Sequence, residues 1–221
     1  MAVLTGGMAG NPRKEMAASF AAGLPAHSRA AGCPRLRCLA SAEPTKLPWR
    51  LLMDLYLLRH AIAVDRGSPG YEDDADRPLT AEGARKMRRA ARGMRRLGLT
   101  FDLILSSPYL RCRQTANIVA EALQAPDKLR FSEALAPEGN GQDLIEELNR
   151  DHSACDSILL VGHEPSLSQL AGVLISGSWQ VSLVMRKGGL CKLSAEALRF
   201  GHCASLEWLL TPSQLSLLRA K

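Results

Sequence analysis

Two histidines and two arginines follow apolar runs of the sequence, at the places where buried strands would end. Arg59 and His60 come directly after one run, His163 directly follows another, and Arg111 lies just beyond the Ser-Ser-Pro that ends a third. A guanidinium presents a planar fork of donors that suits a phosphate group. A neutral imidazole has an unprotonated ring nitrogen and can act as a nucleophile near neutral pH. These residue types predict a phosphate site at which a histidine forms a covalent intermediate.

The elements that would position these residues alternate between strand and helix. Apolar runs at 55–59, 102–106 and 157–162 are typical of central strands in a parallel sheet that is covered on both faces. We expect helices at 80–97, 109–123, 142–150 and 166–175, and further strands at 129–131, 187–194 and 204–210. This order predicts an α/β fold, a three-layer α/β/α sandwich with a mostly parallel central sheet. Because such sheets bind ligands at the carboxyl ends of their strands, we expect the three strand ends to converge.

Two local features refine this expectation. Arg111 would lie in the first turn of a helix, where free backbone N–H groups and the helix dipole favour an anion. Arg113 is the alternative, but it points in another direction and is farther from the helix start. The segment 62–76, with its acidic run at 72–74, is interpreted as a solvated surface loop.

The sequence predicts neither a metal site nor a bound cofactor. The strand ends lack the acidic cluster that Mg²⁺ would need for phosphoryl transfer, and two histidines alone make an incomplete zinc site. The six cysteines are scattered and form no CxxC pair. Such cysteines indicate reduced thiols and a cytoplasmic location.

The net charge of +6 is unevenly distributed over the 221 residues. Residues 1–52 hold seven Lys or Arg and two Glu, so most of the basicity belongs to this segment, and we expect no nucleic-acid partner. The segment is interpreted as an N-terminal extension without a fold: a disordered tail, a transit-peptide-like leader, or sequence that precedes a true start at Met53. No apolar run is long enough for a transmembrane helix, so no membrane association is expected. Residues 53–221 are then expected to form a single catalytic domain.

Four motifs in this part of the chain occur in the order of a known family. They are LLRHA, RPLT, SSPYLRCRQTA and VGHEP, and the similarity extends over about residues 53–210. The chain resembles the histidine phosphatase superfamily, with its phosphoglycerate mutase-like fold, and within it the short SixA-type phosphohistidine phosphatases. Ala61 stands where the family's RHG motif has glycine. Longer members carry an Asn and helical insertions over the pocket, and their absence here implies an open site.

The resemblance implies a role for each site residue. His60 would accept the phosphoryl group, while His163 would complete the catalytic pair. Arg59, Arg111 and the further arginine Arg77 would bind phosphate.

The proton donor to the leaving group is the open point of this mechanism. By resemblance, Glu133 occupies a position where related ester phosphatases and mutases keep an acid, and Glu164 is a second candidate. A phosphohistidine substrate needs less help, because a protonated imidazole leaves readily. We therefore expect a protein phosphohistidine phosphatase whose partner carries phosphohistidine. The alternatives are a small-molecule phosphomonoesterase on the same fold and a non-catalytic phospho-binding scaffold.

Overall fold

The computed structural model describes residues 52–218, and the expectations for the N-terminal extension lie outside these residues. The described part forms a six-stranded sheet in the order β3-β2-β4-β1-β5-β6. Its strands are β1 (Met53–Arg59), β2 (Leu103–Ser106), β3 (Leu129–Phe131), β4 (Ser157–Gly162), β5 (Leu190–Ala195) and β6 (Ala204–Leu210). The first four are parallel, β5 is antiparallel to β1, and β6 is antiparallel to β5. The predicted mostly parallel sheet is therefore confirmed.

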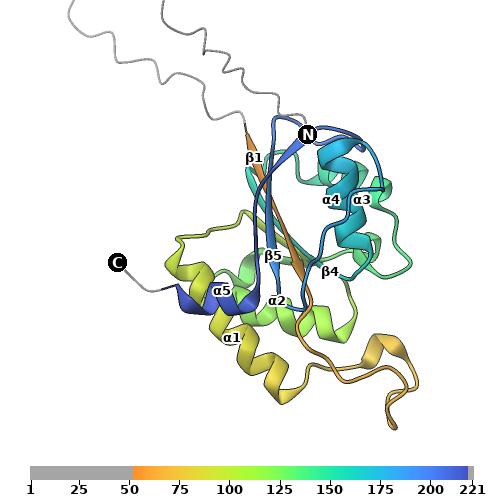
Figure 1. Cartoon of the computed structure of the whole chain (residues 1–221), viewed down its shortest axis with the longest axis vertical. Helices are drawn as coiled ribbons and strands as arrows, with labels where there is room; N and C mark the ends of the chain where they lie inside the picture. The colour runs from red at the N-terminus through yellow and green to blue at the C-terminus, as the bar shows by residue number, and fades with distance from the viewer. Residues whose placement is uncertain (1–51, 219–221) are drawn as a thin grey trace, which may run out of the picture. The chain divides into compact units, whose positions relative to one another are not determined.

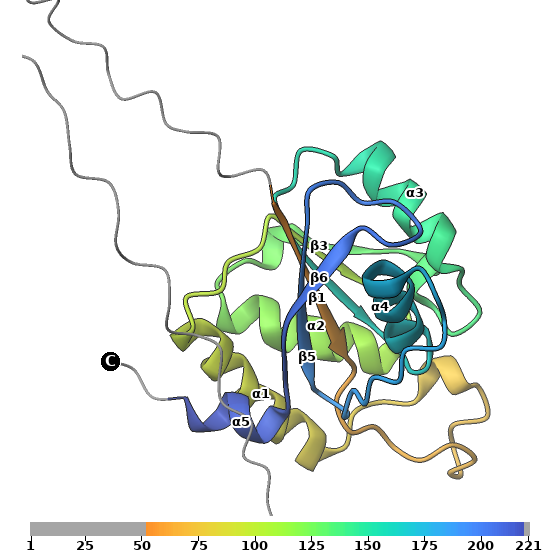
Figure 2. The same ribbon diagram turned by 45° about the horizontal axis from the view of Figure 1, so that its top comes forward.

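Helices cover both faces of the sheet, as Figures 1 and 2 show. They are α1 (Ala81–Arg96), α2 (Leu110–Ala122), α3 (Gly141–Asp151), α4 (Ser166–Ser176) and α5 (Pro212–Leu217). Alternate residues of β1 point to opposite faces, as the period of a strand requires. Leu55 and Leu57 join the core beneath α3 and α4, whereas Tyr56 and Leu58 join the core beneath α1, α2 and α5. The three-layer sandwich predicted from the sequence is confirmed.

Two local features fix where helix α1 begins. Thr80 caps α1 by accepting a hydrogen bond from the Gly83 backbone N–H. Gly83 has no room for a side chain, because a Cβ there would lie 2.0 Å from the Ile62 carbonyl oxygen. This close approach packs the start of α1 against the chain that leaves β1. This contact fixes the position of Ile62, three residues after the end of β1.

Three short turns of 3-10 helix connect the main elements: η1 (Asp74–Asp76), η2 (Pro126–Lys128) and η3 (Glu133–Leu135). The strand expected at 187–194 begins only at Leu190, because Gly188 adopts a positive φ of 77° that makes a turn. That turn donates its Gly188 N–H to the carbonyl oxygens of Arg59 and His60. Within residues 52–218, no helix has the length and apolar character needed to cross a membrane.

Candidate active site

The carboxyl ends of β1, β2 and β4 bring His60, Arg111 and His163 together. The rings of His60 and His163 lie 5.3 Å apart between centroids, and an Nη2 of Arg111 lies 3.2 Å from Nδ1 of His163. All three side chains are buried. Parallel strands end at one edge of a sheet, which is why residues separated by about a hundred positions meet here.

His60 is held in one orientation by its own backbone. Its Nδ1 lies 2.7 Å from the Ala61 carbonyl oxygen, which makes Nδ1 the protonated nitrogen and leaves the lone pair on Nε2. Burial lowers the pKa of His60 to about 4, aided by the positive charges of Arg111, Arg59 and Lys187 and opposed by the Ala61 hydrogen bond. The imidazole is therefore neutral at physiological pH, as a nucleophile must be.

His163 has two polar neighbours that define its tautomer. Arg111 donates to Nδ1, so the proton lies on Nε2, which is 2.9 Å from the Ser107 hydroxyl oxygen. Burial lowers the pKa of His163 to about 3, and the charge of Arg111 adds to this effect. The helix α2 begins at Leu110, and no side chain caps it. The Ser107 hydroxyl oxygen accepts a 3.3 Å hydrogen bond from the Tyr109 backbone N–H and also lies against His163.

Arg111 rather than Arg113 faces the cluster. Arg111 is 2% exposed, whereas the guanidinium of Arg113 lies over the Phe131 ring at 5.4 Å, away from the histidines. Arg59 is held by a 2.8 Å hydrogen bond from its Nη1 to the Met185 carbonyl oxygen. The Nε atoms of Arg59 and Arg111 are buried without a hydrogen-bond partner among the described residues. Such donors are costly to bury, and an anion would satisfy them.

Asp74 corrects the interpretation of 62–76 as a solvated loop. Its Oδ2 accepts from Nη2 of Arg111 at 2.8 Å, and its Oδ1 pairs with Arg77 at 2.8 Å and with Arg66 at 2.9 Å. Burial alone would raise the pKa of Asp74, but the hydrogen bond from Arg66 and the charges of Arg111 and Arg77 hold it well below its usual range. The acidic run was read as solvent-exposed because sequence alone does not show which of its carboxylates turns inward.

The remaining predicted residues lie around this cluster. Arg77 reaches it through Asp74 and also donates to the Val64 carbonyl oxygen. The side chain of Glu133 is exposed, and its carboxylate makes no hydrogen bond or ion pair with a described residue. Glu164 accepts a 2.7 Å hydrogen bond from the Ser168 hydroxyl within the first turn of α4. Among the described residues, neither glutamate carboxylate thus forms a hydrogen bond with the imidazole of His60 or His163.

The cluster has a positive electrostatic balance. Arg77 and Arg111 pair with the carboxylate of Asp74, Arg59 adds a further guanidinium, and both imidazoles are neutral. This balance suits a phosphoryl dianion. Within the described residues, no group of three or more His, Cys, Asp or Glu side chains is arranged to hold a metal ion.

Two further contributors went unrecognised in the sequence. Thr115 accepts a hydrogen bond from the Ala61 backbone N–H and donates to the Arg111 carbonyl oxygen, so it connects the two motifs. Its position four residues after Arg111 was the available signal, because Thr often bonds to the carbonyl one helical turn earlier. Lys187 adds its charge from the turn before β5, and no local pattern marks it.

Comparison with known sequences places this site in a family. Residues 55–136 match the model of the histidine phosphatase superfamily (branch 1). An uncharacterised protein of Picosynechococcus sp. is 39% identical over 161 residues, which cover 72% of this chain and 96% of that protein. The phosphohistidine phosphatase SixA of Escherichia coli is 28% identical over 129 residues, which cover 57% of this chain and 76% of SixA.

Solved structures show the same fold. The protein histidine phosphatase SixA complexed with tungstate matches with a TM-score of 0.63 and 23% identity, over 74% of this chain and 99% of that one. The alpha-ribazole phosphatase of Shigella flexneri matches with a TM-score of 0.52 and 20% identity, over 72% of this chain and 97% of that one. Since both the family model and a relative matched over nearly its whole length support the assignment, this chain belongs to the histidine phosphatase superfamily, branch 1, and is an enzyme of the phosphatase class.

Proposed function

We propose that this enzyme is a protein phosphohistidine phosphatase and that residues 53–221 form its catalytic domain. The observation that carries the mechanism is the state of His60: a neutral ring whose Nδ1 is bound to the Ala61 carbonyl oxygen, so that the Nε2 lone pair is free. In the first step, Nε2 attacks phosphorus, and the bond between phosphorus and the leaving nitrogen breaks. The leaving imidazole takes a proton from solvent. Water then attacks phosphorus, inorganic phosphate leaves, and His60 is restored.

The phosphate-binding roles follow from the arrangement of donors. Arg59 and Arg111 stabilise the charge on the transferring group, and their buried Nε atoms are donors that such a group would pair with. His163 carries its proton on Nε2, which is compatible with donating to a phosphoryl oxygen in place of Ser107. Arg77 forms an ion pair with Asp74 and adds its positive charge to the site.

The choice of substrate rests on the acids near the site. Asp74 is the carboxylate that touches the cluster, and its lowered pKa keeps it ionised, so it is a poor proton donor. The carboxylates of the exposed Glu133 and the Ser168-bound Glu164 form no hydrogen bond with the imidazoles in the described part of the chain. A phosphoramidate tolerates weak acid catalysis better than an alkyl phosphate does. The role of Glu133 as a general acid stays a prediction, and Glu133→Gln tests it.

The comparisons support the same substrate class. The Escherichia coli relative and one matched structure are both named for activity on phosphohistidine. We therefore propose a phosphohistidine-bearing protein as the partner, rather than a small phosphorylated molecule. We also propose a cytoplasmic location, which the free thiols of Cys112, Cys155, Cys191 and Cys203 support.

A substrate panel with one variant and one matched control tests the proposal. The full chain is incubated with a phosphohistidine peptide, 4-nitrophenyl phosphate and 3-phosphoglycerate, alongside His60→Ala and His202→Ala. We expect the peptide to have the highest kcat/KM, and His60→Ala to lower it by about 1,000-fold or more. His202 is exposed and distant from the cluster, so its variant should match the wild type. Faster turnover of either ester would contradict the substrate class, and an active His60→Ala would contradict the mechanism.

A further inference from the structure

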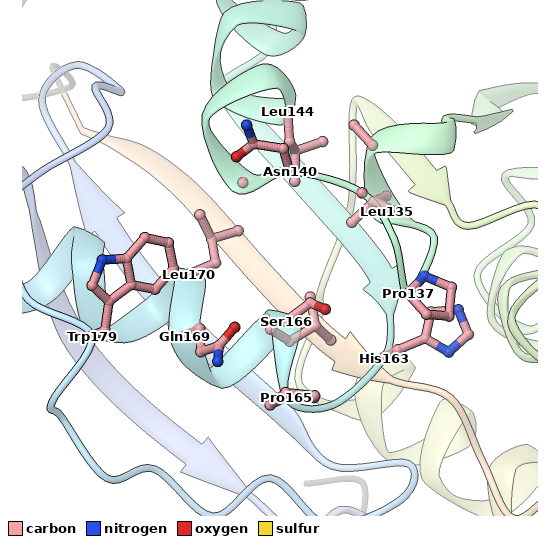
Figure 3. A pocket seen from close by; sticks show the side chains of 14 residues that line it. Leu135, Pro137, Asn140, Leu144, His163, Pro165, Ser166, Gln169, Leu170 and Trp179 are labelled. Carbon is pink, nitrogen blue, oxygen red and sulfur yellow. The ribbon is translucent and has the colours of Figure 1, made fainter.

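A cavity of about 300 Å³ begins at His163 and extends between α4 and the segment that joins η3 to α3. Figure 3 shows His163 and Pro137 at one end of it and Trp179 at the other, with the first turns of α4 between them. We call it the His163–Trp179 cavity. Its volume is at the lower end of the range that ligand sites occupy in proteins. The phosphate cluster and this cavity therefore share one wall, the His163 residue.

The lining of the His163–Trp179 cavity is uncharged. Apolar side chains form much of it, namely Leu135, Leu144, Leu167 and Leu170. Asn140, Ser166 and Gln169 add amide and hydroxyl groups, and none of the described residues that line it is Lys, Arg, Asp or Glu. Trp179 is 56% exposed, which is unusual for so large an apolar side chain. Such a lining favours an uncharged ligand with apolar groups and a few hydrogen-bonding ones.

The wall between this cavity and the phosphate cluster is held in place by Tyr109. Its ring packs edge-on against His163 at 5.3 Å between centroids, and its hydroxyl donates to Glu138 at 3.0 Å. Glu138 lies in the segment that lines the cavity at Pro137 and Gly139. The segment is thus tied to a residue that starts α2, beside Arg111. A group attached to a phosphate at His60 could therefore extend past His163 into this cavity.

We propose that the His163–Trp179 cavity binds an uncharged, apolar stretch of the substrate polypeptide next to its phosphorylated residue. This inference rests on the proposed function and adds a sequence preference to it. The leucines would receive an apolar side chain of the substrate, and Trp179 would cover it. The amides of Asn140 and Gln169 suit the N–H and C=O groups of a peptide backbone. A negatively charged flanking residue would lose its hydration there without gaining an ion pair.

The test compares three phosphohistidine peptides that differ only in the residues flanking the histidine: Leu, Ser or Glu. For the wild type, we expect kcat/KM for the Leu peptide to exceed that for the Glu peptide by about tenfold, which burial of one side chain can supply. Trp179→Ala should reduce this ratio to near one. Gln169→Lys should reverse it, because the new charge attracts the Glu peptide. Leu217→Ala, an exposed position on α5 that does not line the cavity, should keep the wild-type ratio.

Each contrary outcome overturns a different statement. Equal kcat/KM values for the three peptides would refute the role of the cavity and leave the phosphohistidine phosphatase standing. Unchanged peptide ratios in both Trp179→Ala and Gln169→Lys would also refute it. No turnover of any peptide, with turnover of 4-nitrophenyl phosphate, would refute both the proposed function and the polypeptide occupant. A naphthyl phosphate that outperforms every peptide would assign the cavity to a small aromatic molecule instead.

Discussion

In the proposed mechanism, burial and neighbouring charge prepare His60 as a nucleophile. The side chain is 7% exposed, and Arg59, Arg111 and Lys187 all disfavour its protonated form. The same burial would be harmful for a histidine that acts as an imidazolium acid, because it would lower the pKa and remove the proton. In a nucleophile, it keeps the reactive nitrogen free over the whole physiological range. In the proposed mechanism, the positive charges of the site both bind the phosphate and help to keep the imidazole uncharged.

The first prediction concerns the titration of His60. Because the pKa is lowered, the neutral ring should persist as the pH falls from 7 to 5 and become protonated only near pH 4. An NMR titration of the ring, assigned by comparison with His60→Ala, should give this midpoint. Lys187→Ala removes one of the positive charges that disfavour protonation of His60, so it should raise the titration midpoint of His60. Lys128→Ala should leave that midpoint unchanged. A midpoint at the ordinary value of about 6.5 would contradict this account of the nucleophile.

Asp74 is the residue whose importance only its contacts reveal. One carboxylate binds the guanidinium groups of Arg111 and Arg77, and the Arg111 side chain is 3% exposed. A guanidinium so deeply buried is costly unless it is paired, and Asp74 supplies the opposite charge to Arg111. Asp74 therefore acts as a positioning residue, because it orients two arginines without touching the reacting atoms.

The second prediction is that Asp74→Asn lowers kcat/KM for the phosphohistidine peptide by about tenfold, since misplaced groups cost rate steeply. The loss should appear mainly in kcat, because the arginines keep their charge but lose their alignment. Asp76→Asn provides a matched control, since Asp76 is exposed and its side chain forms no ion pair with a described residue. Steady-state kinetics of the two variants decide the matter. Equal activity of Asp74→Asn and wild type would remove Asp74 from the mechanism.

At the scale of elements, α2 connects two strand ends. Its first turn carries Arg111 at the end of β2, and one turn later Thr115 bonds to the Ala61 N–H beyond the end of β1. Ala61 in turn accepts the hydrogen bond from His60. The helix thus fixes the positions of His60 and Arg111, the proposed nucleophile and a proposed phosphate-binding residue, relative to each other. Two buried hydrogen bonds, from the Ala61 N–H to Thr115 and from His60 to the Ala61 carbonyl, link the helix to the His60 ring.

The third prediction tests that connection. Thr115→Val preserves shape but leaves the Ala61 N–H without a partner, which should destabilise the protein by about 1–3 kcal/mol. It should also lower kcat, because the Ala61 carbonyl that orients His60 is free to move. Thr115→Ser keeps the hydroxyl and should restore most of both properties. Urea unfolding and kinetics measure the two effects, and a fully active, fully stable Thr115→Val would contradict the argument.

At the scale of the whole molecule, the site makes stability depend on pH. His60 and His163 are neutral in the folded protein until about pH 4 and 3, while in the unfolded chain they take up protons below about pH 6.5. In this window the unfolded state binds more protons, so stability falls as the pH falls. The two buried histidines of the candidate site therefore lower the stability of the fold in acid.

The fourth prediction is that the free energy of unfolding decreases between pH 6 and pH 5, by roughly 1.4 kcal/mol per pH unit for each of the two histidines. Urea unfolding at both values should show a shallower dependence for His163→Asn than for the wild type. His202→Ala, which changes an exposed histidine, should follow the wild type. A wild type that gains stability on acidification over this range would contradict the prediction.

The sequence by itself determined the framework of this protein. The apolar runs that became β1, β2 and β4 are local patterns, and so are the helix starts and turns between them. Because parallel strands share an edge, the sequence was also enough to predict that His60, Arg111 and His163 would meet. These inferences succeed because each depends on neighbouring residues or on a general rule of sheet topology.

Only the tertiary structure decided which contacts the site residues make with one another. The ion pair of Asp74 with Arg111 joins residues 37 positions apart, and the contact of His163 with Ser107 joins residues 56 apart. The tautomers of both histidines and their lowered pKa values follow from such contacts and from burial. The His163–Trp179 cavity likewise arises where α4 meets the approach to α3. No local pattern encodes these features, because hydrogen bonding, desolvation and cavity shape depend on distances that exist only after the chain has folded.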